Sequence, residues 1–256
     1  MDAFFLKLLL SFVVGGGYIA FTVWVSEKYG SKLGGLMIGL PSTSLMGLIF
    51  IAWTQNDSAA VSAVPIMPAV AGVNSIFVLL FFLLYKKGRG TALAVAFSFW
   101  LVASLFLVLL PMDSLWLSLA LAAVLYAVSA RWLSRFPHRK LPAQRTSRRE
   151  FLLRSVFAGA VVVMAVALAK AFGPLWGGVF SNFPAAFTST LVLVSWKHGE
   201  KFAASVGRTM TFGSIAAVSF GVAFYFLVPA QGLATGVILS ALVAVAVGYV
   251  IYRFVR

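Results

Sequence analysis

The sequence predicts an all-α integral membrane protein of about nine transmembrane helices: four helices, one connector helix and four more. The first observation behind this prediction is composition. Of 256 residues, 62% are hydrophobic and 10% are charged, and the mean hydropathy is +1.02, whereas soluble domains are about 45–50% apolar and about 25% charged. A water-soluble fold of this length could not bury so much apolar surface, so a soluble enzyme is excluded. The second and third observations, charge placement and an internal repeat, follow below.

Apolar runs of spanning length, separated by charged residues or by Pro and Gly, predict the individual helices. The third run is interrupted by Pro65 and Pro68, and a basic linker follows the fifth. This pattern predicts a first four-helix repeat at 1–112, a connector helix and basic cytoplasmic linker at 113–150, and a second four-helix repeat at 151–256. The predicted helices cover about 4–25, 32–53, 58–85, 91–110, 114–134, 151–172, 174–196, 200–228 and 231–252.

The cations segregate when the predicted helices alternate in direction. Only Lys7 and Lys170 fall on one side, and Arg208 lies inside a helix. Lys and Arg concentrate in cytoplasmic loops of membrane proteins, so the basic side is expected to be cytoplasmic. We therefore expect a multi-pass protein of the cytoplasmic (inner) membrane, with its N-terminus outside and its C-terminus cytoplasmic. The remaining cations lie on the basic side: Lys28, Lys32, Lys86, Lys87, Arg89, Arg131, Arg135, Arg139, Lys140, Arg145, Arg148, Arg149, Arg154, Lys197, Lys201, Arg253 and Arg256.

The two halves of the chain share a pattern in the same order. Gly-Gly, four residues, an apolar residue and Pro occur at 34–41 and again at 177–184, an offset of 143. Upstream, 5–7 parallels 152–154, and downstream, 58–60 parallels 202–204. An odd number of predicted crossings separates equivalent points, so the repeats are expected to have inverted topology. Inverted repeats are a common plan of secondary transporters, whose sites lie near the membrane midplane at the repeat interface.

The residues around the first Gly-Gly motif also resemble a known group of proteins. The segment 34–50, with its Leu-Pro-Ser-Thr-Ser turn, and Thr54-Gln-Asn-Asp57 resemble a family of small four-helix bacterial inner-membrane proteins of unknown function. The second half, with Phe183-Pro184 and Arg208-Thr209, is similar to the related GlpM-like proteins. The resemblance implies a fused duplication of a four-helix unit, and it brings no established substrate.

Two prolines predict broken helices. Pro41 and Pro184 each fall about midway along a predicted span, where proline removes a backbone donor and obstructs a carbonyl one turn earlier. A break directs the positive end of the downstream half-helix at the membrane interior, where two such ends could bind an anion. The alternative is an ordinary proline kink healed by Ser and Thr hydroxyls, with Gly-Gly serving close helix packing. The candidate substrate-binding residues are Gly39, Pro41, Ser42, Thr43, Ser44, Asn182, Pro184, Thr188, Ser189 and Arg208.

Arg208 is the charged candidate. It lies about two turns into its predicted helix, and no carboxylate is expected in the spans to neutralise it. Ionisable residues at membrane depth usually face a cavity or the bundle interior, which suits an anionic ligand. The alternative is that Arg208 extends its guanidinium to the cytoplasmic interface. The seven tryptophans, Trp100 among them, fall mostly near predicted helix ends, as expected for an interfacial belt.

These residues predict a secondary transporter or exporter of a small anionic solute, with its site at the interface of the inverted repeats. A channel or lipid-translocating protein, or a non-transporting scaffold for envelope assembly, remains an alternative. None of the six acids is placed mid-membrane and Cys is absent, so we expect no enzyme activity, catalytic residue, metal or cofactor. The expected partners are membrane lipids and the small-molecule or anion substrate, not nucleic acid, and a homodimer stays open.

Overall fold

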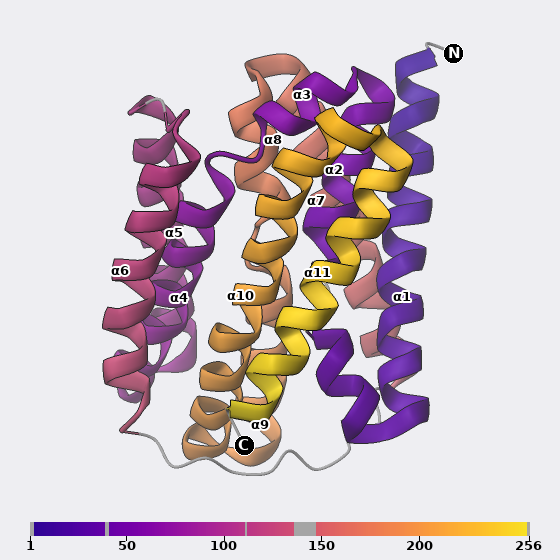
Figure 1. The fold of residues 1–256 in the computed structure, drawn as a ribbon. Coiled ribbons are helices and arrows are strands. Elements are labelled where there is room, and N and C mark those ends of the chain that lie inside the picture. Colours follow the sequence, from indigo (N-terminus) through magenta and orange to yellow (C-terminus); the bar gives the residue numbers. More distant parts are fainter. Residues whose placement is uncertain (1–2, 39–40, 111, 136–146, 255–256) are drawn as a thin grey trace.

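The computed structural model describes residues 3–38, 41–110, 112–135 and 147–254, and every regular element in these ranges is a helix (Figure 1). The predicted all-α class is confirmed. The first part of the chain forms α1 (Ala3–Ile38), α2 (Ser42–Thr54), α3 (Asp57–Ser62), α4 (Met67–Leu83), the 3-10 turn η1 (Tyr85–Lys87), α5 (Arg89–Leu109) and α6 (Leu115–Leu133). The second part forms α7 (Arg148–Phe172), α8 (Pro174–Ser181), α9 (Ala185–His198), α10 (Glu200–Gln231) and α11 (Leu233–Phe254).

Six stretches of the described chain are long and apolar enough to cross a membrane. They are α5, α6, α7, the α8–α9 pair, α10 and most of α11. The protein therefore has the character of a multi-pass membrane protein. The start of α1 and the end of α11 lie at opposite ends of the bundle (Figure 1).

The helix boundaries follow from local chemistry. Ser147 and Glu150 form a capping box that begins α7, each side chain bonding the backbone N–H of the other. Gly173, Gly199 and Gly232 have φ values of 99°, 78° and 77° and join successive helices of the second half. Only glycine adopts this backbone conformation without steric cost, so these turns are set by sequence.

Two predicted boundaries need correction. The helix assignment of α1 is continuous through 26–31, where the sequence predicts a loop. This polar stretch contains no proline, and its residues other than Gly30 are compatible with a helix. The long third span is interrupted near Pro65, between α3 and α4, as predicted, but Pro68 lies in the first turn of α4 and does not interrupt it. Proline is tolerated there because the first helical N–H groups have no partner within the helix.

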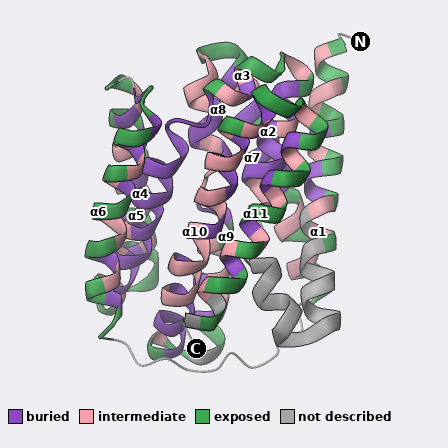
Figure 2. Ribbon diagram, in the orientation of Figure 1, coloured by how far each residue is buried: buried purple, intermediate pink, exposed green. Residues whose placement is uncertain are grey.

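Polar contacts hold α4 inside the bundle. Ala69, near the start of α4, donates its backbone N–H to Ser118 Oγ of α6 at 2.9 Å. Further along the same two helices, the hydroxyls of Ser75 of α4 and Ser129 of α6 lie 2.8 Å apart. Side-chain hydrogen bonds of this kind join helices where lipid supplies no hydrophobic driving force. Figure 2 shows the result: α4 is largely buried, while α5, α6 and α11 present exposed faces.

The outer surface of the bundle is apolar. Val102, Leu109 and Trp116 are 67%, 70% and 70% exposed, and many other Leu and Val side chains point outward. A soluble monomer rarely exposes large contiguous apolar patches, so this surface fits contact with lipid.

α1 and α7 cross at glycines that occupy equivalent places. A Cβ on Gly16 would lie 2.8 Å from the Ser155 carbonyl oxygen, and a Cβ on Gly159 would lie 2.7 Å from that of Phe12. Residue 16 of α1 faces residue 155 of α7, and residue 12 faces residue 159. The numbering therefore rises along one helix as it falls along the other, so the two helices run antiparallel. The four contact residues are also equivalent in sequence, because 12 and 155, and likewise 16 and 159, are separated by the offset of 143 between the two halves.

We predict that Gly159→Ala destabilises the protein by about 1–3 kcal/mol, because the added methyl group meets backbone rather than a movable side chain. Gly17→Ala is the matched control on α1, since its Cβ would meet no atom within 4 Å. Thermal unfolding in detergent should show a lowered midpoint for Gly159→Ala and an unchanged or raised one for Gly17→Ala. Equal midpoints for both variants would contradict the close crossing.

Candidate functional site

Both predicted helix breaks are present. Pro41 is the N-cap residue of α2, with φ −74° and ψ 66°, and Pro184 is the N-cap residue of α9, with φ −76° and ψ 40°. The Pro41 carbonyl accepts from Leu45 N–H at 2.7 Å, and the Pro184 carbonyl accepts from Thr188 N–H at 2.9 Å. The two prolines therefore begin their helices in nearly the same way.

The two breaks meet in the interior. Ser44, in the first turn of α2, places its hydroxyl 3.2 Å from the Ser181 carbonyl oxygen and 3.3 Å from Asn182 Oδ1, and donates to them. Ser44 is 3% exposed and Ser181 is 1% exposed. The N-terminal end of one half-helix is thus bonded to the C-terminal end of another that is far away in sequence. We call Ser44, Asn74, Ser181 and Asn182 the junction.

Asn182 satisfies the backbone freed by the break. Its Nδ2 donates to the Gly178 carbonyl oxygen at 3.1 Å, and its own carbonyl accepts from Asn74 Nδ2 of α4 at 2.8 Å. Asn74 is 5% exposed and its Oδ1 has no partner among the described residues. Sequence reasoning missed Asn74, although an asparagine within an otherwise apolar helix is a usable signal for a polar interior contact.

Helix polarity gives the junction a mixed electrostatic character. The N-terminal ends of α2 and α9 carry partial positive charge, and the C-terminal end of α8 carries partial negative charge. Inside a membrane, unsatisfied backbone groups are tolerated only where protein surrounds them or a cavity is near. Pro41 and Pro184 are both buried, so neither break faces lipid.

Other candidate residues behave as the proline-kink alternative predicts. Thr188 Oγ1 donates to the Pro184 carbonyl oxygen at 2.8 Å, and Ser189 Oγ donates to the Ala186 carbonyl oxygen at 3.3 Å. These hydroxyls therefore bond backbone carbonyls of their own helix or its N-cap, as expected for a proline kink. Ser42 and Thr43 are half-buried in the first turn of α2, and Gly39 lies outside the described residues.

The second Gly-Gly pair serves close packing. A Cβ on Gly177 would meet Ala169 and Ile51 at 2.7 and 2.8 Å, and one on Gly178 would collide with the Ala63 backbone. Gly47 of α2 is pressed against Ser181 in the same way. Small residues therefore let α8 approach its neighbours.

Arg208 is half-buried on α10. Its neighbour Gly207 packs against Val78 and Phe82 of α4. Val78 and Phe82 lie four and eight residues beyond Asn74, so Gly207 contacts α4 about 6–12 Å along the helix axis from Asn74. No hydrogen bond joins Arg208 to the junction within the part of the chain that the structure describes.

Aromatic rings surround the break in the second half. Phe183, between Asn182 and Pro184, packs edge-on against Trp100 at 5.0 Å and stacks on Phe97 at 6.0 Å. Trp100 is fully buried, so its assignment to the interfacial belt is wrong. It lies near the middle of α5, where a tryptophan needs tertiary partners rather than the membrane surface.

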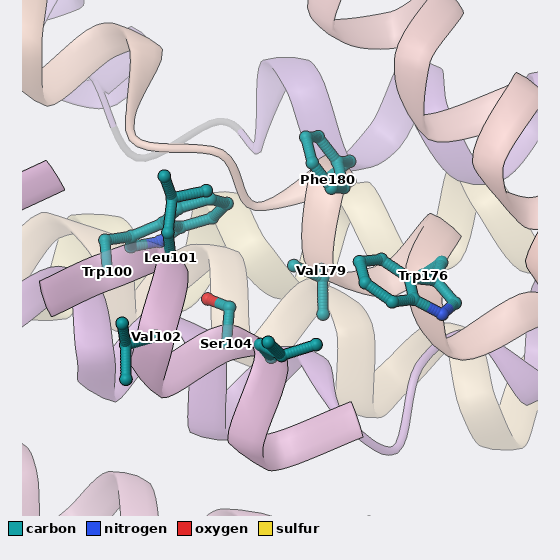
Figure 3. A pocket seen from close by; sticks show the side chains of 8 residues that line it. Trp100, Leu101, Val102, Ser104, Trp176, Val179 and Phe180 are labelled. Atoms are coloured by element: carbon teal, nitrogen blue, oxygen red, sulfur yellow. The ribbon is translucent and has the colours of Figure 1, made fainter. Parts of the chain in front are cut away.

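A cavity of about 240 Å³ lies between α5 and α8, beside this aromatic cluster (Figure 3). Figure 3 shows Trp100 and Ser104 on α5 opposite Val179 and Phe180 on α8. Sequence reasoning did not find this cavity, because it depends on which helix faces which. The lining residues are Trp100, Leu101, Val102, Ser104, Leu105, Trp176, Val179 and Phe180. Among the described residues, no group of three or more His, Asp or Glu side chains could hold a metal ion.

Comparison with known proteins gives one partial match. Residues 8–112 match DUF3147, a protein family of unknown function. The DUF3147 segment contains Pro41, Ser44 and Asn74 but neither Ser181 nor Asn182, so it holds one side of the junction. No curated protein and no solved structure matches the chain.

We predict that Ser44 and Asn182 are energetically coupled. Ser44→Ala and Asn182→Ala should each destabilise the protein, because each leaves buried polar groups without a partner. A double-mutant cycle should give a coupling of about 0.5–1.5 kcal/mol, the range found for hydrogen bonds inside membrane proteins. Ser240→Ala is the control, since Ser240 is buried but donates only to Gly236 O of its own helix. Additive losses at Ser44 and Asn182 would refute the contact.

Proposed function

We propose that the protein is a secondary transporter of a small anionic solute, with its site at the junction between the two halves of the chain. The observation that carries the proposal is the buried contact of Ser44 with Ser181 and Asn182, where two interrupted helices meet. Interrupted helices that meet at mid-membrane are a recurring feature of transporter sites. No catalytic group is needed for this role.

The proposal includes inverted repeats. The antiparallel crossing of α1 and α7, with Gly16 against Ser155 and Gly159 against Phe12, supports a local two-fold relation between the halves. The matching N-cap prolines, Pro41 and Pro184, are separated by the same offset and support it too. The end of the DUF3147 match at residue 112 coincides with the end of the proposed first repeat, which fits a fused, duplicated four-helix unit of the GlpM-like kind.

About nine crossings are proposed. Beyond the six long stretches, three shorter apolar stretches fit the remaining first-half crossings: the first part of α1 (Ala3–Tyr18), α2 (Ser42–Thr54) and α4 (Met67–Leu83). The α2 helix is short because it begins at the break at Pro41, and α4 is short because its span is interrupted near Pro65.

An anionic solute is favoured by the charges near the junction. The N-terminal ends of α2 and α9 supply partial positive charge at the two prolines. Arg208 follows Gly207, which contacts α4 about one to two turns from Asn74, and it supplies a full positive charge at greater depth than the loop cations. In this proposal the solute first contacts the N-terminal ends of α2 and α9. It then contacts Arg208 as it moves towards the other side of the membrane.

A second function, a non-transporting scaffold, is favoured by the close packing of Gly47, Gly177 and Gly178. A scaffold needs no solute path and tolerates loss of Arg208. A channel or lipid-translocating role would use the same junction, and lack of saturation in flux measurements would favour it over a carrier.

We predict that Arg208→Gln abolishes anion binding and leaves membrane insertion intact. A thermal-shift screen of phosphate, sulfate and small carboxylates on the purified protein identifies the anion, since a ligand of the folded state raises the midpoint. Uptake of that anion into proteoliposomes then tests transport. Arg131→Gln, at the end of α6, is the control and should keep binding. Unchanged anion affinity in Arg208→Gln would remove this residue from the site. If neither the unmodified protein nor Arg131→Gln shows saturable uptake, the scaffold is favoured.

We predict an N-terminus outside and a C-terminus inside the cytoplasmic membrane. Reporter fusions that are active only in the cytoplasm should be active after Phe254 and inactive before Ala3. A fusion in the 136–146 segment should also be active, because this segment carries several of the cations. The opposite pattern would reject the proposed orientation, and activity at both termini would reject the odd number of crossings.

A further inference from the structure

Three cations without an acidic partner lie together at one end of the bundle. Lys86 and Lys87 in η1 and Arg89 at the start of α5 are all exposed. Within the described ranges none of these three side chains forms an ion pair, whereas Lys197 is paired with Glu150 at 3.2 Å. Clustered cations beside a membrane attract anionic lipids, so this turn offers a place for a negatively charged headgroup.

A tryptophan marks this place as the membrane surface. The guanidinium of Arg89 lies 5.8 Å from the centre of the Trp196 ring, and Trp196, near the end of α9, is 66% exposed. Exposed tryptophans of membrane proteins gather at the headgroup level, where the indole meets both apolar and polar groups. Beside this pair, the Tyr85 hydroxyl donates to the Ser195 carbonyl oxygen at 3.4 Å. The start of α5 and the end of α9 therefore form one surface at the headgroup level.

From this surface α5 and the α8–α9 pair run side by side into the bundle. Phe97 stacks on Phe183 at 6.0 Å, and further along Trp100 packs edge-on against Phe180 at 6.0 Å. The numbering rises along α5 as it falls along α9 and α8, so the two elements are antiparallel. We call the line between them the seam.

The seam leads to the apolar cavity between α5 and α8 (Figure 3). Leu101, Val102 and Leu105 at its rim are 54%, 67% and 46% exposed, so the cavity is open towards lipid. None of the eight lining residues is charged. At about 240 Å³ it is smaller than the sites of drug-sized ligands, and it can take the end of one acyl chain.

The depth of the cavity matches the length of a lipid. Leu101 and Leu105 follow Arg89 by 12 and 16 residues, which is about 18–24 Å along the helix. A bilayer is about 40–45 Å thick with its headgroups, so its midplane lies about 20–22 Å from the headgroup surface. Gly90 and Ala94 are exposed on the same face of α5 as Leu101, and a Cβ on Gly90 would meet no atom within 4 Å. One lipid can therefore reach both the cations and the cavity.

We infer that an anionic phospholipid binds along the seam, from the leaflet at this end of the bundle. Its phosphate contacts Lys86, Lys87 and Arg89, its glycerol backbone lies beside Trp196, and one acyl chain ends in the cavity. A free phosphate or an acidic protein segment would match the charges but would leave the apolar cavity empty. In the predicted orientation this leaflet is the cytoplasmic one. The inference goes beyond the proposed transport function, since it uses no residue of the junction.

The test compares lipids that differ in headgroup or in chain length alone. Palmitoyl-oleoyl-phosphatidylglycerol, the phosphatidylcholine with the same chains, and dihexanoyl-phosphatidylglycerol are titrated onto the full-length protein in detergent. Native mass spectrometry counts the bound molecules and gives the affinities. The long-chain phosphatidylglycerol should bind more tightly than either of the other lipids. Inorganic phosphate is the fourth probe and should bind more weakly than all three.

Charge variants test the headgroup end. Combining Lys86→Gln, Lys87→Gln and Arg89→Gln should weaken binding of the long-chain phosphatidylglycerol by about five-fold for each cation removed. The preference over phosphatidylcholine should then disappear.

The matched control removes the same charge from the same end of the bundle, at the ends of α6 and α11. It combines Arg131→Gln, Arg135→Gln and Arg253→Gln, and it should keep the preference for phosphatidylglycerol. Equal losses in the two triple variants would show a diffuse effect of net charge and overturn the inference.

A bulky residue tests the acyl-chain end. Leu105→Trp at the exposed rim should weaken binding of the long-chain phosphatidylglycerol and leave the dihexanoyl lipid unchanged, because short chains do not reach the cavity. Val128→Trp, on the exposed face of α6, is the control and should change neither. Equal affinity for phosphatidylglycerol and phosphatidylcholine, or no effect of Leu105→Trp, would overturn the inference. Phosphate binding as tight as that of the long-chain lipid would overturn it in favour of a free anion.

Discussion

Backbone N–H and C=O groups exposed by a helix break cannot be left to the hydrocarbon core, because no water is there to bond them. The chain breaks its helices at Pro41 and Pro184 and must therefore supply partners from within. It does so with few atoms: Ser44 bonds the end of α8, Asn182 bonds Gly178, and Asn74 bonds the carbonyl of Asn182.

Small residues make this arrangement possible. Gly178 lets α8 approach the backbone at Ala63, and Gly47 and Gly177 leave room for side chains of the neighbouring helices. Gly16 and Gly159 bring α1 and α7 close to each other's backbone. In a membrane, helix association relies on packing and hydrogen bonds rather than on a hydrophobic drive. The glycines allow the helices to approach closely, and this close approach makes the short polar contacts of the junction possible.

The helical class, the proline breaks and most helix boundaries were predictable, because composition, proline chemistry and charged loops act locally. The continuation of α1 through 26–31 was not, since polar residues without proline are compatible with both helix and loop. Ser44 and Asn182 were recognised as candidates from their position beside the prolines. Their mutual contact, the role of Asn74 and the burial of Trp100 depend on which helix faces which, and no local pattern encodes that.

The chemistry of the junction also limits what can regulate it. Serine hydroxyls and asparagine amides neither gain nor lose protons across the physiological range. The hydrogen bonds of Ser44, Asn74 and Asn182 therefore persist unchanged between an acidic and an alkaline compartment. Any dependence of the stability of this region on pH must therefore enter through groups elsewhere in the protein.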